Sequence, residues 1–309
     1  MSAGKVLVTP RSLTEAGLES VPELDALRER GYELVSGPAG RVPTEQQLLE
    51  VVPGCIGWLA GVEHITEAVL GAATGLRVIS RNGTGTDGID MPAATRAGVR
   101  VERALGANAQ GVAELALTLT LCALRHVTSS AAALQAGRWE RTQGSELPDS
   151  TVGVVGLGAI GRLTAHIFRA LGSEVVAYDP FVTDADVRLM DLDELLAVSD
   201  VISLHCPPSP DGTPLIDTAR LGHVSRGAVL VNTARSALVD EGAVLAALED
   251  GALSSYGVDA FDTEPPQMTA LLRHPRVIAT PHLGGYTRAS VRRATVQAVE
   301  NLVHALDRG

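Results

Sequence analysis

The chain has 309 residues, of which 45% are hydrophobic and 20% are charged, a composition typical of a globular protein with two ordinary domains. Its formal net charge of −11 disfavours nucleic acid as a partner, and no apolar run approaches the ~18 residues of a membrane-spanning helix. The three cysteines lack metal-ligand spacing, so we expect reduced thiols, a cytoplasmic protein, no membrane partner and no metal.

Short apolar segments and helical segments alternate over the first hundred residues. Strands are predicted at 5–8, 32–35, 55–59 and 77–80, and helices at 20–30, 44–51 and 66–73. A Gly-rich loop at 82–88 follows the fourth strand. This alternation is typical of a parallel sheet with helices on both faces.

An Ala- and Leu-rich stretch from Asn108 to Val127 predicts one long helix with little charge. A helix that is apolar around most of its circumference must be buried on several sides, so it lies between domains or between subunits. A polar loop with Trp139 follows at 137–150.

A second alternating series begins at residue 151. Strands are predicted at 152–155, 174–178, 200–205, 229–232, 256–259 and 277–280, and helices at 160–171, 192–198, 241–249 and 289–306. The sequence therefore predicts an α/β fold with two doubly wound parallel-sheet (Rossmann-like) domains and a cleft between them.

The motif Gly156-Leu157-Gly158-Ala159-Ile160-Gly161 follows a predicted strand and opens a predicted helix, which is the context of a dinucleotide-binding turn. Asp179 ends the next strand, close to the spacing of about 20 residues at which an acid binds the ribose. A carboxylate there would repel a 2′-phosphate, so the sequence favours NAD over NADP.

Three polar residues, Arg235, Glu264 and His282, follow strands of the second series, at the edge where such sheets bind ligands. A histidine can give and take a proton near neutral pH, and a carboxylate beside it orients the ring. An arginine fork suits a carboxylate and polarises an adjacent carbonyl. Together they predict hydride transfer at a carbon next to a carboxylate.

Four motifs make nearly the whole chain resemble the D-isomer-specific 2-hydroxyacid dehydrogenase family, nearest to the D-3-phosphoglycerate dehydrogenases. They are the Gly-rich turn above, Val231-Asn232-Thr233-Ala234-Arg235, Gly257-Val258-Asp259-Ala260-Phe261-Asp262-Thr263-Glu264-Pro265, and Thr280-Pro281-His282-Leu283-Gly284-Gly285.

The resemblance implies roles for individual residues. His282 is the acid or base at the ketone oxygen, Glu264 is its partner, and Arg235 binds the substrate carboxylate and carbonyl oxygen. The remaining implied cofactor contacts are His205, Cys206 and Pro207 on the adenine side, Thr213 near the phosphates, Thr233 and Ala234 at the nicotinamide half, and Asp259 on the carboxamide.

The resemblance also implies a domain division and a substrate loop. Residues 1–103 with 284–309 would form a flavodoxin-like substrate-binding domain, and 104–283 the NAD-binding Rossmann domain with the helix that forms a homodimer. The loop Arg81-Asn82-Gly83-Thr84-Gly85 would bind substrate, with the amides of Thr84 and Gly85 on its carboxylate.

The chain departs from the resemblance at Leu59-Ala60-Gly61, where family members often carry an arginine or serine that helps to hold an anionic tail. Arg81, or Arg138 and Arg141 of a partner subunit, could replace that group. The predicted function is an NAD-dependent D-2-hydroxyacid dehydrogenase whose substrate has an anionic tail such as that of 3-phosphoglycerate.

Three alternatives share this pattern of residues. One is a reductase or dehydrogenase for another 2-keto acid or a phosphonate. Another is oxidation of phosphite on the same fold. The third belongs to a different class, a non-enzymatic NAD-sensing protein similar to a corepressor, because the fold alone does not define the function.

Overall fold

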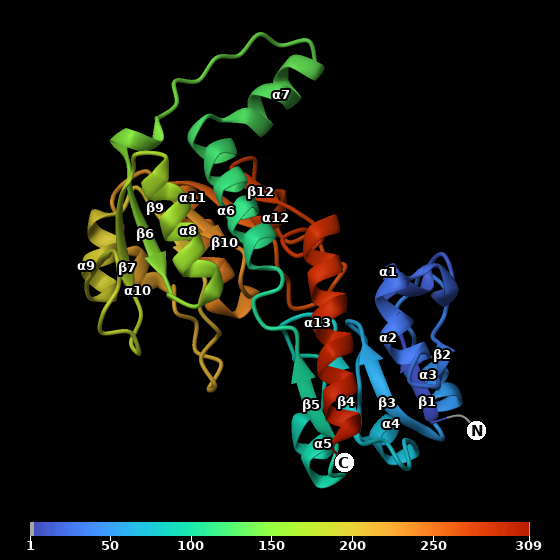
Figure 1. Cartoon of the computed structure of the whole chain (residues 1–309). Helices are drawn as coiled ribbons and strands as arrows, with labels where there is room; N and C mark the ends of the chain where they lie inside the picture. Colours follow the sequence, from blue (N-terminus) through green and yellow to red (C-terminus); the bar gives the residue numbers. More distant parts are fainter. Residues whose placement is uncertain (1–2, 309) are drawn as a thin grey trace. The chain divides into compact units, whose positions relative to one another are not determined.

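A computed structural model describes residues 3–308 of the chain (Figure 1). The chain forms two compact units, Met1–Asn108 with Thr287–Gly309 (unit 1) and Ala109–Tyr286 (unit 2). Each contains one parallel sheet with helices, which confirms the predicted α/β fold of two Rossmann-like parts. The cleft between them stays a prediction.

Unit 1 is built on a five-stranded parallel sheet in the order β2-β1-β3-β4-β5. The strands are β1 (Gly4–Val8), β2 (Tyr32–Ser36), β3 (Cys55–Ala60), β4 (Val78–Arg81) and β5 (Arg100–Arg103). Successive side chains point to opposite faces, so Leu59 packs in one core and its neighbour Trp58 in the other.

Helices cover both faces of this sheet. The first core contains residues of α1 (Arg11–Thr14), α2 (Asp25–Arg28) and α13 (Arg288–Asp307), and the second contains α3 (Glu45–Val51), α4 (Glu67–Ala72) and α5 (Met91–Arg96). Thr44 starts α3 with a capping box, in which its hydroxyl accepts from the Gln47 amide and the Gln47 side chain accepts from the Thr44 amide.

The C-terminal helix α13 returns to unit 1 and lies along β3, β4 and β5 (Figure 1). Leu302 is fully buried, and its Cδ1 would lie 3.1 Å from a Cβ on Gly57 of β3. The Ser80 hydroxyl donates to the Ala298 carbonyl at 2.7 Å. The last twenty residues of the chain therefore complete the core of its first hundred.

Unit 2 is built on a seven-stranded parallel sheet in the order β12-β11-β10-β9-β6-β7-β8. The strands are β6 (Thr151–Val155), β7 (Glu174–Tyr178), β8 (Arg188–Leu189), β9 (Val201–Leu204), β10 (Ala228–Asn232), β11 (Leu253–Val258) and β12 (Val277–Ala279). The strand order reverses between β6 and β9, and such a switch point is where open parallel sheets bind ligands.

One face of this sheet is covered by α6 (Ala109–Leu124) and α8 (Ala159–Ala170). The other face is covered by α9 (Leu192–Val198), α10 (Thr218–Leu221), α11 (Glu241–Asp250) and α12 (Ala270–Arg273). A Cβ on Gly257 of β11 would lie 3.1 Å from Leu119 Cβ of α6, so this helix packs directly on the sheet.

Two predicted helices are wrong in their extent. The segment predicted as one helix at 20–30 is divided at Pro22 into the short 3-10 turns Leu18–Ser20 and Pro22–Leu24, followed by α2. The long helix predicted at 108–127 ends at Leu124, because His126 has a φ of +52°, and α7 (Val127–Gln135) follows. The elements α1, α5, β5, α7, β8, α10 and α12 were not predicted.

No single helix within residues 3–308 has the length and apolarity needed to cross a membrane. The bent pair α6 and α7, which meet at 62°, meets these criteria only when taken together, as buried core helices also can.

Replacing Leu302 with alanine should lower the free energy of unfolding by about 2–5 kcal/mol, because it leaves a cavity against β3. Urea denaturation measures this. Val296→Ala, on the same helix but with 38% of the residue exposed, is the control and should change stability by less than ~1 kcal/mol. Equal small effects would contradict the docking of α13 on the sheet.

Candidate active site

The three glycines of the turn between β6 and α8 have different surroundings. Gly156 has a φ of +94°, and a Cβ there would lie 2.8 Å from the His205 carbonyl group. A Cβ on Gly161 would lie 1.8 Å from the Gly156 carbonyl oxygen. Strand and helix approach so closely that both positions require glycine for folding alone.

Gly158 differs, because among residues 3–308 no atom apart from its own chain neighbours lies within 4 Å of the place its Cβ would take. It is exposed, and as the N-cap of α8 it supplies no side-chain acceptor to the first amides of the helix. Free amides at a helix N-terminus attract anionic groups. Packing does not require this glycine, so the space in front of it can admit phosphates.

Asp179 follows β7 and lies against the same turn. Its Oδ2 accepts from the Leu157 amide at 2.7 Å, and its Oδ1 accepts from the Phe181 amide at 2.9 Å. These two bonds hold the carboxylate at the end of β7 with partly exposed oxygens. The arrangement places a negative charge beside the turn, as ribose binding without a 2′-phosphate requires.

His205 and Thr233 follow the neighbouring strands β9 and β10, and each buries a polar atom. His205 Nδ1 and Thr233 Oγ1 have no hydrogen-bond partner in the described part of the chain. His205 Nε2 lies 2.8 Å from Ser203 Oγ, and burial lowers the pKa of this histidine to about 4. Buried unpaired atoms are rare, and here they fit a polar ligand such as a dinucleotide.

The remaining predicted cofactor residues lie on the same loops. Cys206 is partly buried, and burial raises the pKa of its thiol to about 11, whereas Pro207 is exposed. Thr213 lies in an exposed loop, where its amide donates to Asp211 at 2.9 Å. Ala159 and Ile160 form the first turn of α8, next to the open space at Gly158.

The predicted acid–base pair is formed in unit 2. His282 Nδ1 lies 2.6 Å from Glu264 Oε1, and both side chains are about half exposed. His282 has a φ of +53°, which is uncommon for a residue with a Cβ. Because Nδ1 faces the carboxylate, Nε2 is left to meet a substrate oxygen.

Asp259 holds the loop that carries His282. Its residue is 2% exposed, and its Oδ1 accepts from the Thr280 hydroxyl at 2.6 Å and the Leu283 amide at 2.7 Å. Its Oδ2 accepts from the Gly284 amide at 2.8 Å. The sequence suggested Asp259 only as a cofactor contact, and this second role was missed.

Arg235 is positioned by residues that sequence reasoning did not select. The buried Asn232 donates through Nδ2 to the Arg235 carbonyl at 2.8 Å and accepts at Oδ1 from the Ala234 amide at 3.1 Å. Tyr256 is buried on the neighbouring strand β11, and burial raises the pKa of its hydroxyl. Asn232 directly precedes the predicted site residues Thr233 to Arg235, so its position in the motif could have indicated a role. Tyr256, in contrast, has nothing in its sequence surroundings that distinguishes it from an ordinary core residue.

The predicted substrate loop follows β4 in unit 1. Arg81 Nη1 donates to the Asn82 carbonyl at 2.8 Å, and Gly83 has a φ of +152°. The Thr84 hydroxyl donates to the Ala104 carbonyl at 3.2 Å, and Gly85 lies next to it, partly exposed. Asn82 Oδ1 is buried without a hydrogen-bond partner among the described residues, so a polar ligand can be accommodated here too.

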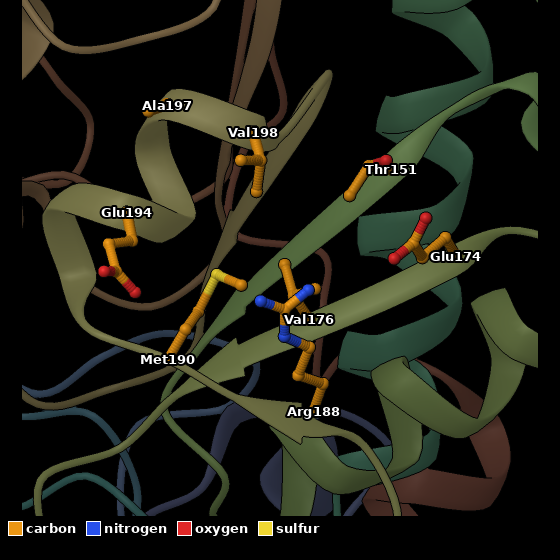
Figure 2. A pocket seen from close by; sticks show the side chains of 8 residues that line it. All are labelled: Thr151, Glu174, Val176, Arg188, Met190, Glu194, Ala197 and Val198. Carbon is orange, nitrogen blue, oxygen red and sulfur yellow. The ribbon is translucent and has the colours of Figure 1, made fainter.

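A cavity of about 420 Å³ lies elsewhere in unit 2, between α9 and the first residues of β6 and β7 (Figure 2). It is lined by Thr151, Glu174, Val176, Arg188, Met190, Glu194, Ala197 and Val198. Since Thr151 and Glu174 begin their strands, this cavity is at the edge opposite the Gly-rich turn and is distinct from the predicted site. Within residues 3–308 no three His, Cys, Asp or Glu side chains are grouped to hold a metal ion.

Comparison with known proteins identifies the family. Residues 117–284 match the D-isomer specific 2-hydroxyacid dehydrogenase NAD binding domain. D-3-phosphoglycerate dehydrogenase of Mycobacterium leprae (strain TN) is 40% identical over 272 residues, which are 85% of this chain and 52% of that protein. This chain therefore spans about half the length of such relatives.

Hydroxypyruvate reductase of Thermotoga maritima is 34% identical over 270 residues, covering 85% of this chain and 88% of that protein. The solved structure of a Thermus thermophilus protein named TT0316 has a TM-score of 0.88 and 36% identity, covering 98% and 97% of the two chains. The chain belongs to the D-isomer-specific 2-hydroxyacid dehydrogenase family, and the domain match confirms NAD as the predicted cofactor.

Gly158→Ala should leave the melting temperature nearly unchanged but weaken NADH binding by about tenfold or more, because the new methyl group occupies space that the phosphates need. Fluorescence titration with NADH measures this. Gly71→Ala, where a Cβ also has no neighbour within 4 Å, is the matched control and should bind NADH normally. Normal affinity in the Gly158 variant would contradict this placement of the phosphates.

The buried His205 should make the protein less stable as the pH falls from about 6.5 to 4. The unfolded chain binds a proton on this ring near pH 6.5, but the native state does so only near pH 4, so acid favours unfolding by up to about 1.4 kcal/mol per pH unit.

Urea denaturation at several pH values, compared with His205→Gln, isolates this contribution. The variant should show a shallower loss of stability over that pH range. Identical slopes in the two proteins would contradict a neutral buried imidazole.

Proposed function

We propose that this protein is an NAD-dependent D-2-hydroxyacid dehydrogenase, which transfers hydride between nicotinamide C4 and C2 of a 2-hydroxy or 2-keto acid. The observation that carries the proposal is the 2.6 Å contact between His282 Nδ1 and Glu264 Oε1 on the sheet that bears the Gly-rich turn. An imidazole held in this way can exchange a proton with a substrate oxygen through Nε2.

The acid–base step follows from this geometry. In the direction of reduction, His282 donates the Nε2 proton to the ketone oxygen, and Glu264 stabilises the charged ring that precedes the transfer. Arg235, whose backbone is held by Asn232, binds the substrate carboxylate and polarises the carbonyl. Bound NADH supplies the hydride. In oxidation the same histidine acts as the base.

The cofactor would be held along the carboxyl edge of the unit 2 sheet. Gly158 and the N-terminus of α8 would accept the phosphates and Asp179 the ribose hydroxyls. The unpaired polar atoms of His205 and Thr233 would meet the adenine and nicotinamide halves respectively. Asp259 retains about one acceptor site, on Oδ2, for the carboxamide beyond the three hydrogen bonds that it accepts.

Unit 1 would supply further donors to the substrate carboxylate that Arg235 binds. The loop from Arg81 to Gly85 follows a parallel strand, and the backbone amides of Thr84 and Gly85 and the Arg81 guanidinium are suited to an anion. We assign the substrate-binding role to unit 1 and the cofactor-binding role to unit 2.

A homodimer is part of the proposal. Large apolar side chains of the segment from α6 to the following loop are exposed, with Val127 at 49%, Leu134 at 59% and Trp139 at 82%. A contiguous exposed apolar segment is typical of an interface between subunits. The unpaired cysteines fit a reducing compartment, in accordance with a cytoplasmic location.

The decisive experiment follows NADH absorbance with a panel of short 2-keto acids. His282→Ala should lower kcat by about 10²–10⁴-fold while NADH affinity is retained, because the ring moves a proton and holds no part of the cofactor. His304→Ala, an exposed histidine of α13, is the matched control and should be fully active.

Each contrary outcome identifies what is wrong. Tight NADH binding without turnover of any keto acid would contradict the enzyme and favour an NAD-sensing binding protein. A preference for NADPH would contradict only the role of Asp179 and would leave the rest of the proposal unchanged.

A further inference from the structure

Two charged side chains are buried in the described part of the chain, Asp259 in unit 2 and Glu63 in unit 1. Asp259 holds the loop of His282, whereas the proposed reaction assigns no role to Glu63. The Glu63 residue is 2% exposed and lies three positions beyond the end of β3. Burying a carboxylate is costly unless it is hydrogen-bonded, so its surroundings decide its role.

Two hydrogen bonds hold the Glu63 side chain. Trp58 Nε1 donates to Thr9 Oγ1 at 2.9 Å, so the Thr9 hydroxyl acts as an acceptor there and directs its own proton to Glu63 Oε1. The Gly61 amide donates to the same Oε1 at 2.9 Å. Both donors meet one oxygen, which fixes the orientation of the carboxyl group beside Gly61.

The backbone that carries Glu63 lies next to the predicted substrate loop. Ala60, at the end of β3, pairs with Arg81, at the end of β4, and the Asn82 amide donates to the Ala60 carbonyl at 2.8 Å. Neighbouring strands are about 4.8 Å apart. Beyond the strands, a Cβ on Gly88 would lie 2.8 Å from the Glu63 carbonyl oxygen, so the two loops remain in contact.

Glu63 also determines what Gly61 can be. A Cβ on Gly61 would lie 2.7 Å from Glu63 Oε2 and 3.0 Å from Pro10 Cα. A side chain at this position would require the Glu63 carboxyl group or Pro10 to move, and an acidic oxygen takes the adjacent space. The Arg81 guanidinium lies over Gly83 instead, where Nη1 would be 3.1 Å from a Cβ.

Two opposite charges therefore follow neighbouring strands at this edge of unit 1. Arg81 ends β4, and Glu63 follows the end of β3. We propose that Glu63 determines substrate specificity: its negative charge disfavours a phosphorylated tail relative to an uncharged tail, such as one that ends in a hydroxyl group. This inference rests on the proposed function, in which the substrate carboxylate is bound beside Arg81.

The test compares hydroxypyruvate with 3-phosphohydroxypyruvate, two 2-keto acids that differ only in the phosphoryl group on the tail. The wild-type protein should have the higher kcat/KM with hydroxypyruvate. Glu63→Gln keeps the size of the side chain but removes its charge, so the ratio should shift towards the phosphorylated substrate by about tenfold or more.

Glu67→Gln is the matched control, because Glu67 is an exposed acid of the same unit that pairs with Arg96 at 2.6 Å. It should leave the ratio unchanged. A purely structural role for Glu63 would lower kcat/KM for both substrates equally, and an unchanged ratio in the Glu63 variant would overturn the inference.

If Glu63→Gln does not fold, the wild-type ratio decides: a higher kcat/KM with 3-phosphohydroxypyruvate overturns the inference, and the opposite preference supports it. Failure to reduce any 2-keto acid would instead contradict the proposed function. This inference would then have no basis, because it rests on that function.

Discussion

The geometry of the candidate site depends on the buried carboxylate of Asp259. It accepts hydrogen bonds from the Thr280 hydroxyl and from the amides of Leu283 and Gly284, which lie on both sides of His282. A residue with a φ of +53° persists only where its surroundings hold it, and these bonds supply that restraint. The imidazole then meets Glu264 at hydrogen-bond distance. A charged group with three donors compensates for its burial and fixes the loop at the same time.

Polar side chains fix the nearby backbone by hydrogen bonds at several other strand ends. In a parallel sheet every strand delivers its loop to one edge, and the loops can carry polar groups that the apolar strands cannot. Asn232 folds the turn before Arg235, Asp179 binds the amide of Leu157, and Glu63 binds the amide of Gly61. Each case uses a side chain at the edge to fix a nearby backbone. The reacting groups can therefore remain exposed while their positions are set by buried neighbours.

The proposed reacting groups were selected because they lie in short motifs with a strong chemical logic. A histidine, an acid and an arginine that each follow a strand of one parallel sheet are delivered to the same edge of it. The positioning groups could not be predicted in this way. Glu63 meets a threonine 54 residues earlier, and Asp259 binds an amide 25 residues later. Only folding brings such residues together, and a lone acid in a sequence is more often a solvated one.

Sequence alone determined the alternation of strands and helices and the Gly-rich turn with its acid, and it proposed three reacting side chains, because these follow from local periodicity and chemistry. Tertiary structure decided three further features. It divided the glycines into two that packing requires and one, Gly158, that packing leaves open. It packed α13 on unit 1 with Leu302 buried against the sheet, an association that the family resemblance implied but that no local pattern in the sequence records. It ended the long helix at Leu124, because a left-handed residue redirects the chain there, and no hydrophobic pattern records a change of backbone direction.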